Sequence, residues 1–550
     1  MIALRPLRVL LPLALAGLPA CAGTGDGGSA DGAAAGPGVV AERPASPLPD
    51  PDGWGAHVLA LAVAPDGAVW VGTYGQGIFV SRSGRGDDWE RIVASRDDSM
   101  SISWDFVNAF AFTGDETWYG TVGNGWGVSL DGGRTWENWT FRKLGPRWQY
   151  VVPNGIAVAG DTVFVATADG LRITADDGEN WREVTEDNGL FNKYLLALGV
   201  TPVEGAGTRV RVAHLRGVSE SADGGRTWTH ARAMGGEETR ALLAAAPEAD
   251  AGEPVLGTGI PAATCAHSDL TRRICEWTRV FRGYPDPGGE ATGPSERRHF
   301  RFARPVRPED NPRLDQTYTY GSTMGGNFQQ HQGVEFNVPE GTPIHAIGDG
   351  TVAFAGEAEA GALTVVVRHD EPLDGQAVWS TYFHNLSLSV REGDRVRAGD
   401  EVARAGNTGR ATNDHLHLEI HVTPPDADVS VVVSPDERYP PFTRNPQLWI
   451  EPLPGTGAIA GRVFDAAGEP VPGARVYGVT KPGPVETPFS FAETYEDRAN
   501  PDPVFQEHFA IGDVPAGMYV LGVKIEGAKV WRKVRVEAGK VTEVEFRPQL

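Results

Sequence analysis

The chain has 550 residues and a formal net charge of −23, and it contains 70 glycines and 41 prolines. This length exceeds what one hydrophobic core usually organises, and so many turn residues favour short strands over long helices. An acidic surface repels nucleic acid phosphates and anionic lipid headgroups, which excludes both as partners through bulk charge. We therefore predict an all-β protein of about three domains.

The N-terminus has the features of an export signal. Two arginines precede an apolar run that ends at Leu18 and is too short to span a membrane, so residues 1–20 are predicted to be a signal peptide. The sequence LPAC that ends at Cys21 resembles a lipobox, and residues 21–50 follow as a flexible tether. The prediction is an exported lipoprotein that meets the membrane only through a lipid on Cys21. The alternative is cleavage after Ala20 and a periplasmic or secreted protein.

Two further cysteines lie close together in the sequence. Lipidation would use Cys21 and leave Cys265 and Cys275, which are close enough to close a short loop. An oxidising compartment outside the cytoplasm favours a disulfide between them. Two buried free thiols are the alternative.

Residues 51–281 contain an internal repeat. Tryptophans at positions 89, 136, 181, 228 and 277 recur about every 47 residues, and alternating apolar strands precede the motifs that end in them. Residues 129–136 and 221–228 match the pattern Ser-x-Asp-x-Gly-x-Thr-Trp in full, and residues 174–181 match it nearly. This pattern resembles the Asp-box, or bacterial neuraminidase repeat. The resemblance predicts a β-propeller of about five blades, whose terminal blades end at Trp89 and Trp277 and have lost the polar residues of the box.

In that family the Asp-box is a folded turn at the outer edge of a blade. Its carboxylate caps backbone N–H groups, its glycine adopts a positive φ, and its tryptophan packs beneath the turn. The repeats are therefore fold markers and not catalysts. A sialidase would also need an arginine cluster, a tyrosine nucleophile and a buried acid, which we do not place convincingly. The expected partner of the propeller is a glycan or a protein.

Three further segments follow the repeats. Residues 282–317 are rich in Pro, Gly, Arg and Glu without periodicity and are predicted to be a linker. Residues 318–452 contain the candidate site. Residues 457–550 alternate strands with Asp/Gly and Pro/Gly turns and resemble the carboxypeptidase regulatory-like, or transthyretin-like, β-sandwich. We interpret this last segment as a spacer or adhesion module.

Histidines are concentrated in the middle segment. Seven of the thirteen lie between His331 and His421. One group stands in the sequence Asp414-His415-Leu416-His417-Leu418-Glu419-Ile420, which alternates polar and apolar residues. As a strand, this sequence places His415 and His417 on one face while the leucines enter a core. Two imidazoles on one face of a strand are suited to a shared metal site.

The other groups complete a set for zinc hydrolysis. A catalytic zinc takes three protein ligands from histidine and carboxylate and keeps a fourth position for water, and His331, Glu335 and His417 provide such a set. The metal activates its water and polarises the scissile carbonyl. His384 and His415 remain to orient the water, stabilise the oxyanion or pass a proton to the leaving amine. On spacing alone, a structural metal site or an ordinary polar sheet face is an equal alternative.

The same segment resembles the lysostaphin-like (LytM-type) zinc endopeptidases. The resemblance rests on residues 340–352, 393–400 and 406–410, which match the turns of that family, and on the closing His415-Leu416-His417. It implies an antiparallel β-sheet peptidase domain with zinc ligands His331, Glu335 and His417. It also implies that His384 and His415 are the catalytic pair. One residue departs from the pattern, because the family usually has aspartate where this chain has Glu335.

The predicted function is that of an exported Zn²⁺ metalloendopeptidase that cuts peptide crosslinks of bacterial peptidoglycan. One alternative is a non-catalytic relative that binds the cell wall or regulates a hydrolase. In another, the propeller is the main functional unit and the peptidase is vestigial. The remaining histidines of the segment are expected to have other roles. His345 and His369 are interpreted as packing or surface residues. His421 is interpreted at most as a residue that contacts a metal ligand and does not bind the metal itself.

Overall fold

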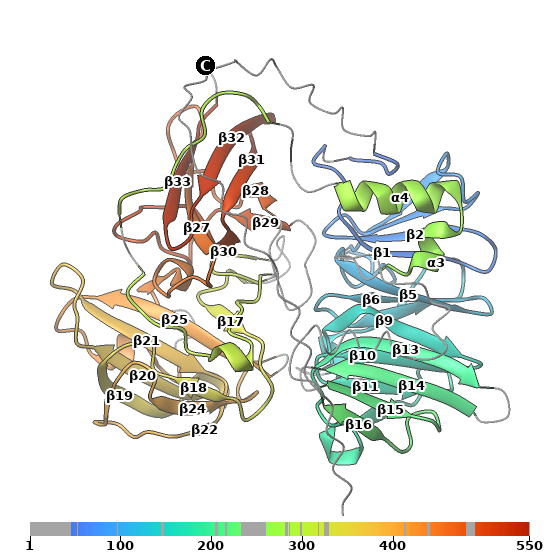
Figure 1. Ribbon diagram of the computed structural model, residues 1–550, viewed down its shortest axis with the longest axis horizontal. Helices are drawn as coiled ribbons and strands as arrows, with labels where there is room; N and C mark the ends of the chain where they lie inside the picture. Colours follow the sequence, from blue (N-terminus) through green and yellow to red (C-terminus); the bar gives the residue numbers. More distant parts are fainter. Residues whose placement is uncertain are drawn as a thin grey trace, which may run out of the picture. The chain divides into compact units, whose positions relative to one another are not determined.

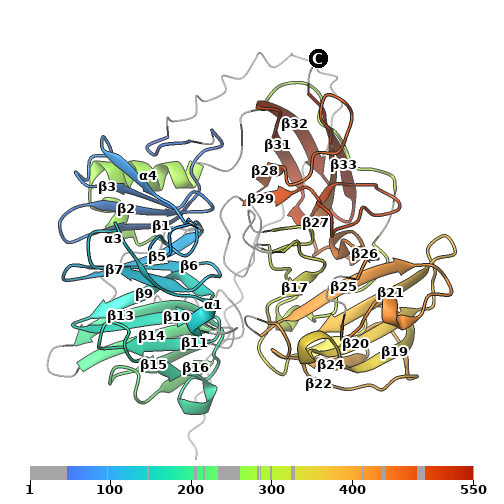
Figure 2. The same cartoon turned by 180° about the vertical axis from the view of Figure 1, so that it is seen from behind.

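The computed structural model describes residues 46–548 apart from 52, 96, 145–147, 204–206, 215–216, 233–259, 281–283, 285, 298–299, 317, 324–328, 412–413, 437–439 and 480–489. The predicted signal peptide, Cys21 and most of the tether lie outside the described residues. No helix within the described ranges is both long and apolar enough to cross a membrane. Strands dominate, which confirms the all-β fold class (Figures 1 and 2).

The repeat region forms four antiparallel sheets of four consecutive strands each. Figure 1 shows the sheets one after another in chain order, and their first strands are in contact with those of the next sheet. The sheets contain β1 (Val58–Val63), β2 (Val69–Thr73), β3 (Ile78–Ser81) and β4 (Trp89–Ile92); β5 (Val107–Thr113), β6 (Glu116–Thr121), β7 (Trp126–Ser129) and β8 (Glu137–Trp139); β9 (Val151–Ala159), β10 (Thr162–Thr167), β11 (Gly170–Thr174) and β12 (Arg182–Val184); and β13 (Leu195–Val203), β14 (Gly207–His214), β15 (Gly217–Ser221) and β16 (Thr229–Arg232). No closed propeller is found in the described part of the chain, so closure and blade count stay predictions.

The Asp-box turns have the expected hydrogen bonds. In the turn that follows β7, Asp131 accepts hydrogen bonds from the backbone N–H of Thr135 at 2.9 Å and from its hydroxyl at 2.6 Å. Gly133 has φ +90° and donates its N–H to the hydroxyl of Ser129. The indole of Trp136 donates to the carbonyl of Gly133. The hydrogen bonds from Thr135 and Ser129 lower the pKa of the Asp131 carboxyl to about 2. These polar residues therefore serve the turn.

Trp277, which was predicted to end the fifth blade, lies in a helix and not at the end of a strand. Leu270, Ile274 and Trp277 are spaced as on one face of a helix, and all three are buried. Leu270 and Ile274 pack with the core of the first sheet. The tryptophan spacing thus continues into a helical segment. The helical elements up to this point are α1 (Phe141–Leu144), η1 (Glu186–Asn188), α3 (Ala262–Ala266) and α4 (Asp269–Val280).

Cys265 and Cys275 form a disulfide, which confirms that prediction. Their Cα atoms are 5.8 Å apart, and the bond joins α3 to α4. Both cysteines belong to the core that lies against the first sheet. The disulfide therefore holds this helix pair in place on that sheet.

The middle segment folds into two sheets. The larger has seven strands in the order β17-β25-β21-β20-β19-β23, with β26 beside β25, and the smaller has the order β18-β24-β22 (Figure 2). In β25, Leu416, Leu418 and Ile420 are fully buried, as the alternation predicted. The elements are η2 (Pro308–Asp310), β17 (Val334–Phe336), β18 (Pro343–His345), β19 (Gly350–Glu357), η3 (Glu359–Gly361), β20 (Leu363–His369), β21 (Ala377–Phe383), β22 (Asn385–Leu388), β23 (Arg395–Val396), β24 (Glu401–Ala405), β25 (Leu416–Thr423), η4 (Val429–Val431), β26 (Thr443–Arg444) and η5 (Pro446–Leu448).

The C-terminal segment forms two further sheets, with orders β30-β27-β33 and β29-β28-β31-β32. Part of it shares a hydrophobic core with the middle segment, because Tyr495, Ala499 and Phe505 belong to the same buried cluster as Val334 and Leu418. The two segments are therefore packed together and not merely joined. The strands are β27 (Thr456–Val463), β28 (Arg475–Val479), β29 (Ser490–Glu493), β30 (Phe509–Pro515), β31 (Gly517–Ile525), β32 (Ala528–Val536) and β33 (Val541–Phe546).

The predicted linker is also bonded to its surroundings. The N–H groups of Arg301 and Phe302 donate to the carbonyl of Trp449, and Ser295 donates its N–H to the carbonyl of Val541. An aperiodic composition indicates irregular structure, but it does not indicate that a segment is unattached.

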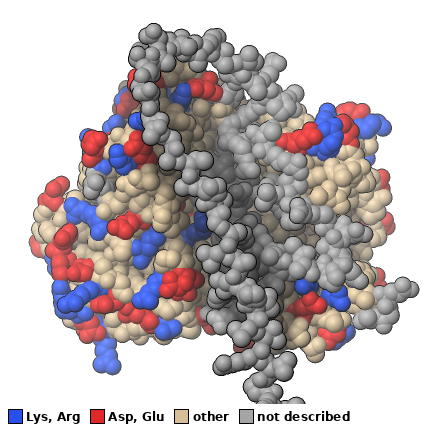
Figure 3. Space-filling model, in the orientation of Figure 1, with Lys and Arg blue, Asp and Glu red and all other residues tan. Residues whose placement is uncertain are grey.

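On the face shown in Figure 3, basic and acidic side chains are interspersed over the described surface.

A buried carboxyl in the C-terminal segment predicts a pH-dependent stability. Glu507 is fully buried and accepts a hydrogen bond from the hydroxyl of Tyr495. Burial, together with the charge of Asp502, raises its pKa to about 8. Between its usual pKa near 4.5 and about 8, the folded chain keeps a proton that the unfolded chain has lost. This contribution to stability is present at low pH and is lost as the pH rises through that window.

Urea unfolding of the wild type and of Glu507→Gln should therefore show different pH profiles. The wild type should lose stability relative to the variant between about pH 4.5 and 8, because glutamine cannot ionise. The exposed Glu469→Gln serves as the control and should follow the wild type. A difference between wild type and Glu507→Gln that does not change with pH would contradict the assignment.

Candidate functional site

Two neighbouring strands bring the first candidate residues together. β17 pairs antiparallel with β25, and the register sets Glu335 opposite His417. On its other side β25 pairs with β21, so that Phe383 lies opposite His417. His384 follows directly after β21. Because side chains alternate along a strand, His415, His417 and Glu419 share the face that is turned away from the leucine core.

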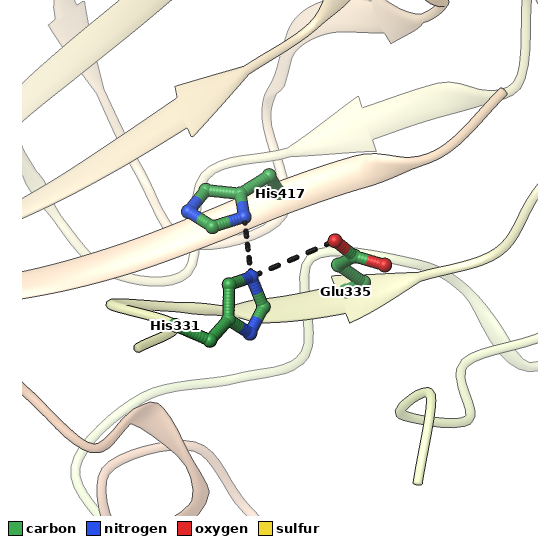
Figure 4. Close-up of side chains that lie close together, drawn as sticks. All are labelled: His331, Glu335 and His417. Carbon is green, nitrogen blue, oxygen red and sulfur yellow. Dashed lines mark hydrogen bonds and ion pairs between the residues drawn. The ribbon is translucent and has the colours of Figure 1, made fainter. Parts of the chain in front are cut away.

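Three ligand atoms converge in front of these strands (Figure 4). His331 Nε2 lies 3.1 Å from His417 Nδ1 and 3.5 Å from Glu335 Oε1. One ligand atom from each residue falls within 4.8 Å of the other two. The donor set is two imidazole nitrogens and one carboxylate oxygen, which matches a catalytic zinc with a fourth position for water. The site therefore fits the metal predicted from the sequence, and the longer side chain of Glu335 reaches the same point.

Burial shifts the protonation of His331 in favour of a metal and that of Glu335 against one. The His331 side chain is 6% exposed. Burial, with the nearby His417 and His415, lowers the pKa of His331 well below its usual range. A neutral imidazole offers a nitrogen lone pair to a metal. Burial also raises the pKa of Glu335 well above its usual range, and the charge of Asp315 adds to this. A cation bound at this point would oppose that shift, because it favours the carboxylate form.

The proposed catalytic pair lies beside the metal ligands. The rings of His384 and His415 have centroids 4.8 Å apart. His384 has a positive φ of 63°, and its Nδ1 donates to the carbonyl of Thr408 at 2.8 Å, which leaves Nε2 as an acceptor. Burial, with the nearby His415 and His417, lowers the pKa of His384 well below its usual range. His415 Nε2 lies 3.7 Å from Glu335 Oε1. Both histidines are thus near the ligands.

A second carboxylate stands behind the ligand His417. Glu419 Oε1 lies 3.2 Å from His417 Nε2, and its other oxygen lies 3.0 Å from His421 Nε2. Burial opposes ionisation of Glu419, but the two nearby imidazoles outweigh it and lower the pKa of Glu419 to about 2. A carboxylate on the second nitrogen of a ligand histidine orients the ring. No role was predicted for Glu419, although its position on the same face of the strand as His415 and His417 was a signal in the sequence.

The other histidines of the segment take the positions expected of them. His421 is fully buried behind Glu419. The His345 ring contacts the carbonyl of Gly399, and His369 bonds to Ser380 at 2.9 Å and packs on Phe302. Neither His345 nor His369 belongs to the group of converging ligand atoms.

A lysine from the repeat region lies next to the site. Lys193 Nζ lies 2.7 Å from Asp414 Oδ2, and the two side chains are 8% and 1% exposed. Its backbone N–H donates to Glu186 Oε1 at 2.9 Å. Asp414 directly precedes His415, so this ion pair holds the start of the histidine strand. The sequence offered no motif that would have singled out Lys193.

Comparisons with known proteins agree with this geometry. Residues 329–429 match the family described as Peptidase family M23. Over 98 residues the chain is 38% identical to an uncharacterized metalloprotease of Haemophilus influenzae, which covers 18% of this chain and 20% of that protein. Over 92 residues it is 35% identical to peptidoglycan DD-endopeptidase ShyA of Vibrio cholerae, covering 17% and 20%.

A solved structure is also similar to part of the chain. The catalytic domain of the antimicrobial peptidase lysostaphin from Staphylococcus simulans shares 26% identity, covers 24% of this chain and 88% of its own, and has a TM-score of 0.19. The chain spans about a fifth of the length of the two curated relatives described above. Each of these similarities covers a quarter of the chain or less.

The glycine between the ligands gives a prediction about the metal site. A Cβ on Gly333 would lie 2.6 Å from His417 Nε2 and 2.6 Å from the carbonyl oxygen of Leu418. Gly333→Ala should displace the His417 ring and weaken zinc binding by roughly tenfold or more. Gly356→Ala is the control, because the atom nearest to its Cβ would be in the Phe354 ring at 3.5 Å, an ordinary contact distance. Zinc competition with a chromophoric chelator measures both, and equal affinities would refute the steric argument.

The ion pair of Lys193 predicts a loss of stability on truncation. Lys193→Met removes one partner of a buried pair and should lower the free energy of unfolding by on the order of 3 kcal/mol. Asp414→Asn in the same chain should recover part of that loss, since the carboxylate is then gone. Lys143→Met removes an exposed pair with Glu137 and should cost under about 1 kcal/mol. Additive effects of the Lys193 and Asp414 substitutions in urea unfolding would show that the pair is not coupled.

Proposed function

We propose that the chain is an exported zinc metalloendopeptidase that hydrolyses peptide crosslinks of bacterial peptidoglycan. The observation that carries the proposal is the convergence of His331 Nε2, Glu335 Oε1 and His417 Nδ1 in a segment that matches Peptidase family M23. The name of the Vibrio cholerae relative, a peptidoglycan DD-endopeptidase, supports the substrate class. A related Neisseria meningitidis protein is named a DD-carboxypeptidase/endopeptidase.

In this proposal His331, Glu335 and His417 hold the zinc. A bound zinc acts as a Lewis acid that lowers the pKa of its water to about 7 and polarises the scissile carbonyl. Glu419 keeps the His417 ring oriented by bonding its second nitrogen. The buried position of the ligands limits their access to bulk water, which strengthens every electrostatic interaction at the site.

His384 is proposed to transfer protons, and His415 is proposed to stabilise the negative charge of the oxyanion. The hydrogen bond from His384 Nδ1 to Thr408 fixes the tautomer, so that neutral Nε2 can accept a proton from water and return it to the leaving amine. His415 lies beside it, and we propose that it donates a hydrogen bond to the oxyanion that forms from the scissile carbonyl. No covalent bond between the chain and its substrate is required.

The remaining assignments are proposals that rest on the sequence. We propose an anchor through a lipid on Cys21 and a propeller formed by residues 51–281 that binds a glycan or protein. We also propose a peptidase domain over residues 318–452 and a sandwich over residues 457–550. A regulator that keeps the fold without catalysis is the second candidate function. The presence of all four histidines of the site favours the enzyme.

Substitutions at the site should produce two different failures. His417→Ala removes a ligand and should abolish zinc binding. His384→Ala should keep the metal and reduce turnover by about 100-fold, the usual scale for an acid–base partner. Zinc content by metal analysis, and mass analysis of muropeptides released from peptidoglycan, separate the two outcomes. A His384→Ala chain without zinc would overturn the division of roles, and zinc-loaded wild type that releases nothing would favour the regulator.

A further inference from the structure

The three proposed ligands are not held in the same way. Glu335 and His417 lie on paired strands, so the register of β17 and β25 fixes their backbones. His331 lies before β17, in a segment without helix or strand. A metal site needs its ligands held within a fraction of an ångström, so other contacts must fix the position of His331.

The backbone of His331 is bonded to an adjacent turn. Its N–H donates to the carbonyl of Ser322 at 3.0 Å, and its carbonyl accepts from the N–H of Gly321 at 2.8 Å. The ring stacks on Tyr318, with centroids 4.0 Å apart. The position of His331 therefore depends on the position of residues 321–323.

Glu493, at the end of β29 in the C-terminal sandwich, holds that turn. One of its carboxylate oxygens accepts from the Ser322 hydroxyl at 3.0 Å and from the Thr323 N–H at 2.6 Å. The other accepts from the Thr323 hydroxyl at 3.0 Å. Glu493 is 6% exposed, and hydrogen bonds to a buried carboxylate are among the stronger ones in proteins.

The two neighbours of His331 in the sequence bind the same part of the sandwich. Gln330 Oε1 accepts from the N–H groups of Arg498 and Ala499, at 3.1 and 2.8 Å. Gln332 Nε2 donates to the carbonyl of Arg498 at 2.7 Å. Both glutamines are about 95% buried, and Gln330 also donates to the carbonyl of Gly321. Contacts from residues 493–499 thus flank His331 on both sides of its backbone.

We propose that residues 493–499 of the C-terminal sandwich are a positioning element of the metal centre, with Glu493 and Gln330 as its positioning residues. The inference rests on the proposed function only in taking His331 as a zinc ligand. It assigns the sandwich a part in building the site, in place of the spacer or adhesion role expected from sequence. The shared core supports it, because Ala499 packs in the same cluster as Val334.

The test compares zinc affinity in matched variants of the full chain. Glu493→Ala and Gln330→Leu should each bind zinc roughly 10- to 100-fold more weakly than the wild type, the scale for partners that orient a metal ligand. Gln330→Glu keeps the acceptor oxygen for Arg498 and Ala499, so its affinity should lie between those of wild type and Gln330→Leu. Glu496→Ala changes an exposed carboxylate of the same segment and should bind zinc as the wild type does.

The readout is the zinc dissociation constant by chelator competition, with circular dichroism to establish that each variant is folded. If Glu493→Ala does not fold, Glu493→Gln and the two Gln330 variants decide the matter. Folded Gln330 and Glu493 variants with wild-type zinc affinity would overturn the proposal, even if their melting temperatures fall. Zinc binding by a wild type that does not cleave peptidoglycan would count against the enzyme alone and leave this inference standing.

Discussion

The pairing of β17 with β25 is the constraint on which the site depends. It sets Glu335 opposite His417, and a slip of one residue would turn one of the two side chains into the leucine core. The buried leucines of β25 oppose such a slip, because it would expose them and bury imidazoles in their place. The same apolar alternation that stabilises the sheet therefore also orients the proposed ligands.

Around this pair, the other groups come from irregular segments that must each be held separately. His384 follows β21 with a positive φ, and its ring is fixed by the carbonyl of Thr408. His331 depends on hydrogen bonds to residues 321–322 and, through them, to Glu493. Side-chain hydrogen bonds replace the sheet ladder where the chain has no strand to guide it. The geometry of a metal site assembled in this way depends on residues well outside its set of ligands.

Contacts between segments that are distant in the sequence are the part of the structure that the sequence indicates least. Lys193 meets Asp414 across 221 residues of sequence, and Glu493 meets Thr323 across 170. Such contacts involve single residues with no periodicity or motif, so no local pattern marks them. At Trp277 the sequence does contain a pattern, but the pattern predicts the wrong element. Its spacing continues the repeat, yet the residues around it have the periodicity of a helix, and the local periodicity decided the structure.

The sequence by itself determined the strand-rich fold class, the Asp-box turns, the disulfide and the residues of the proposed zinc site. Each depends on a short-range pattern: alternation along a strand, turn residues at fixed offsets, or a pair of nearby cysteines. Only the tertiary structure decided that the helix of Trp277 packs on the core of the first sheet. It alone also decided that Glu419 stands behind His417 and that residues 493–499 of the C-terminal segment bond to the residues around His331. The physical reason is that these outcomes depend on which buried surfaces meet, and that depends on the packing of the whole chain.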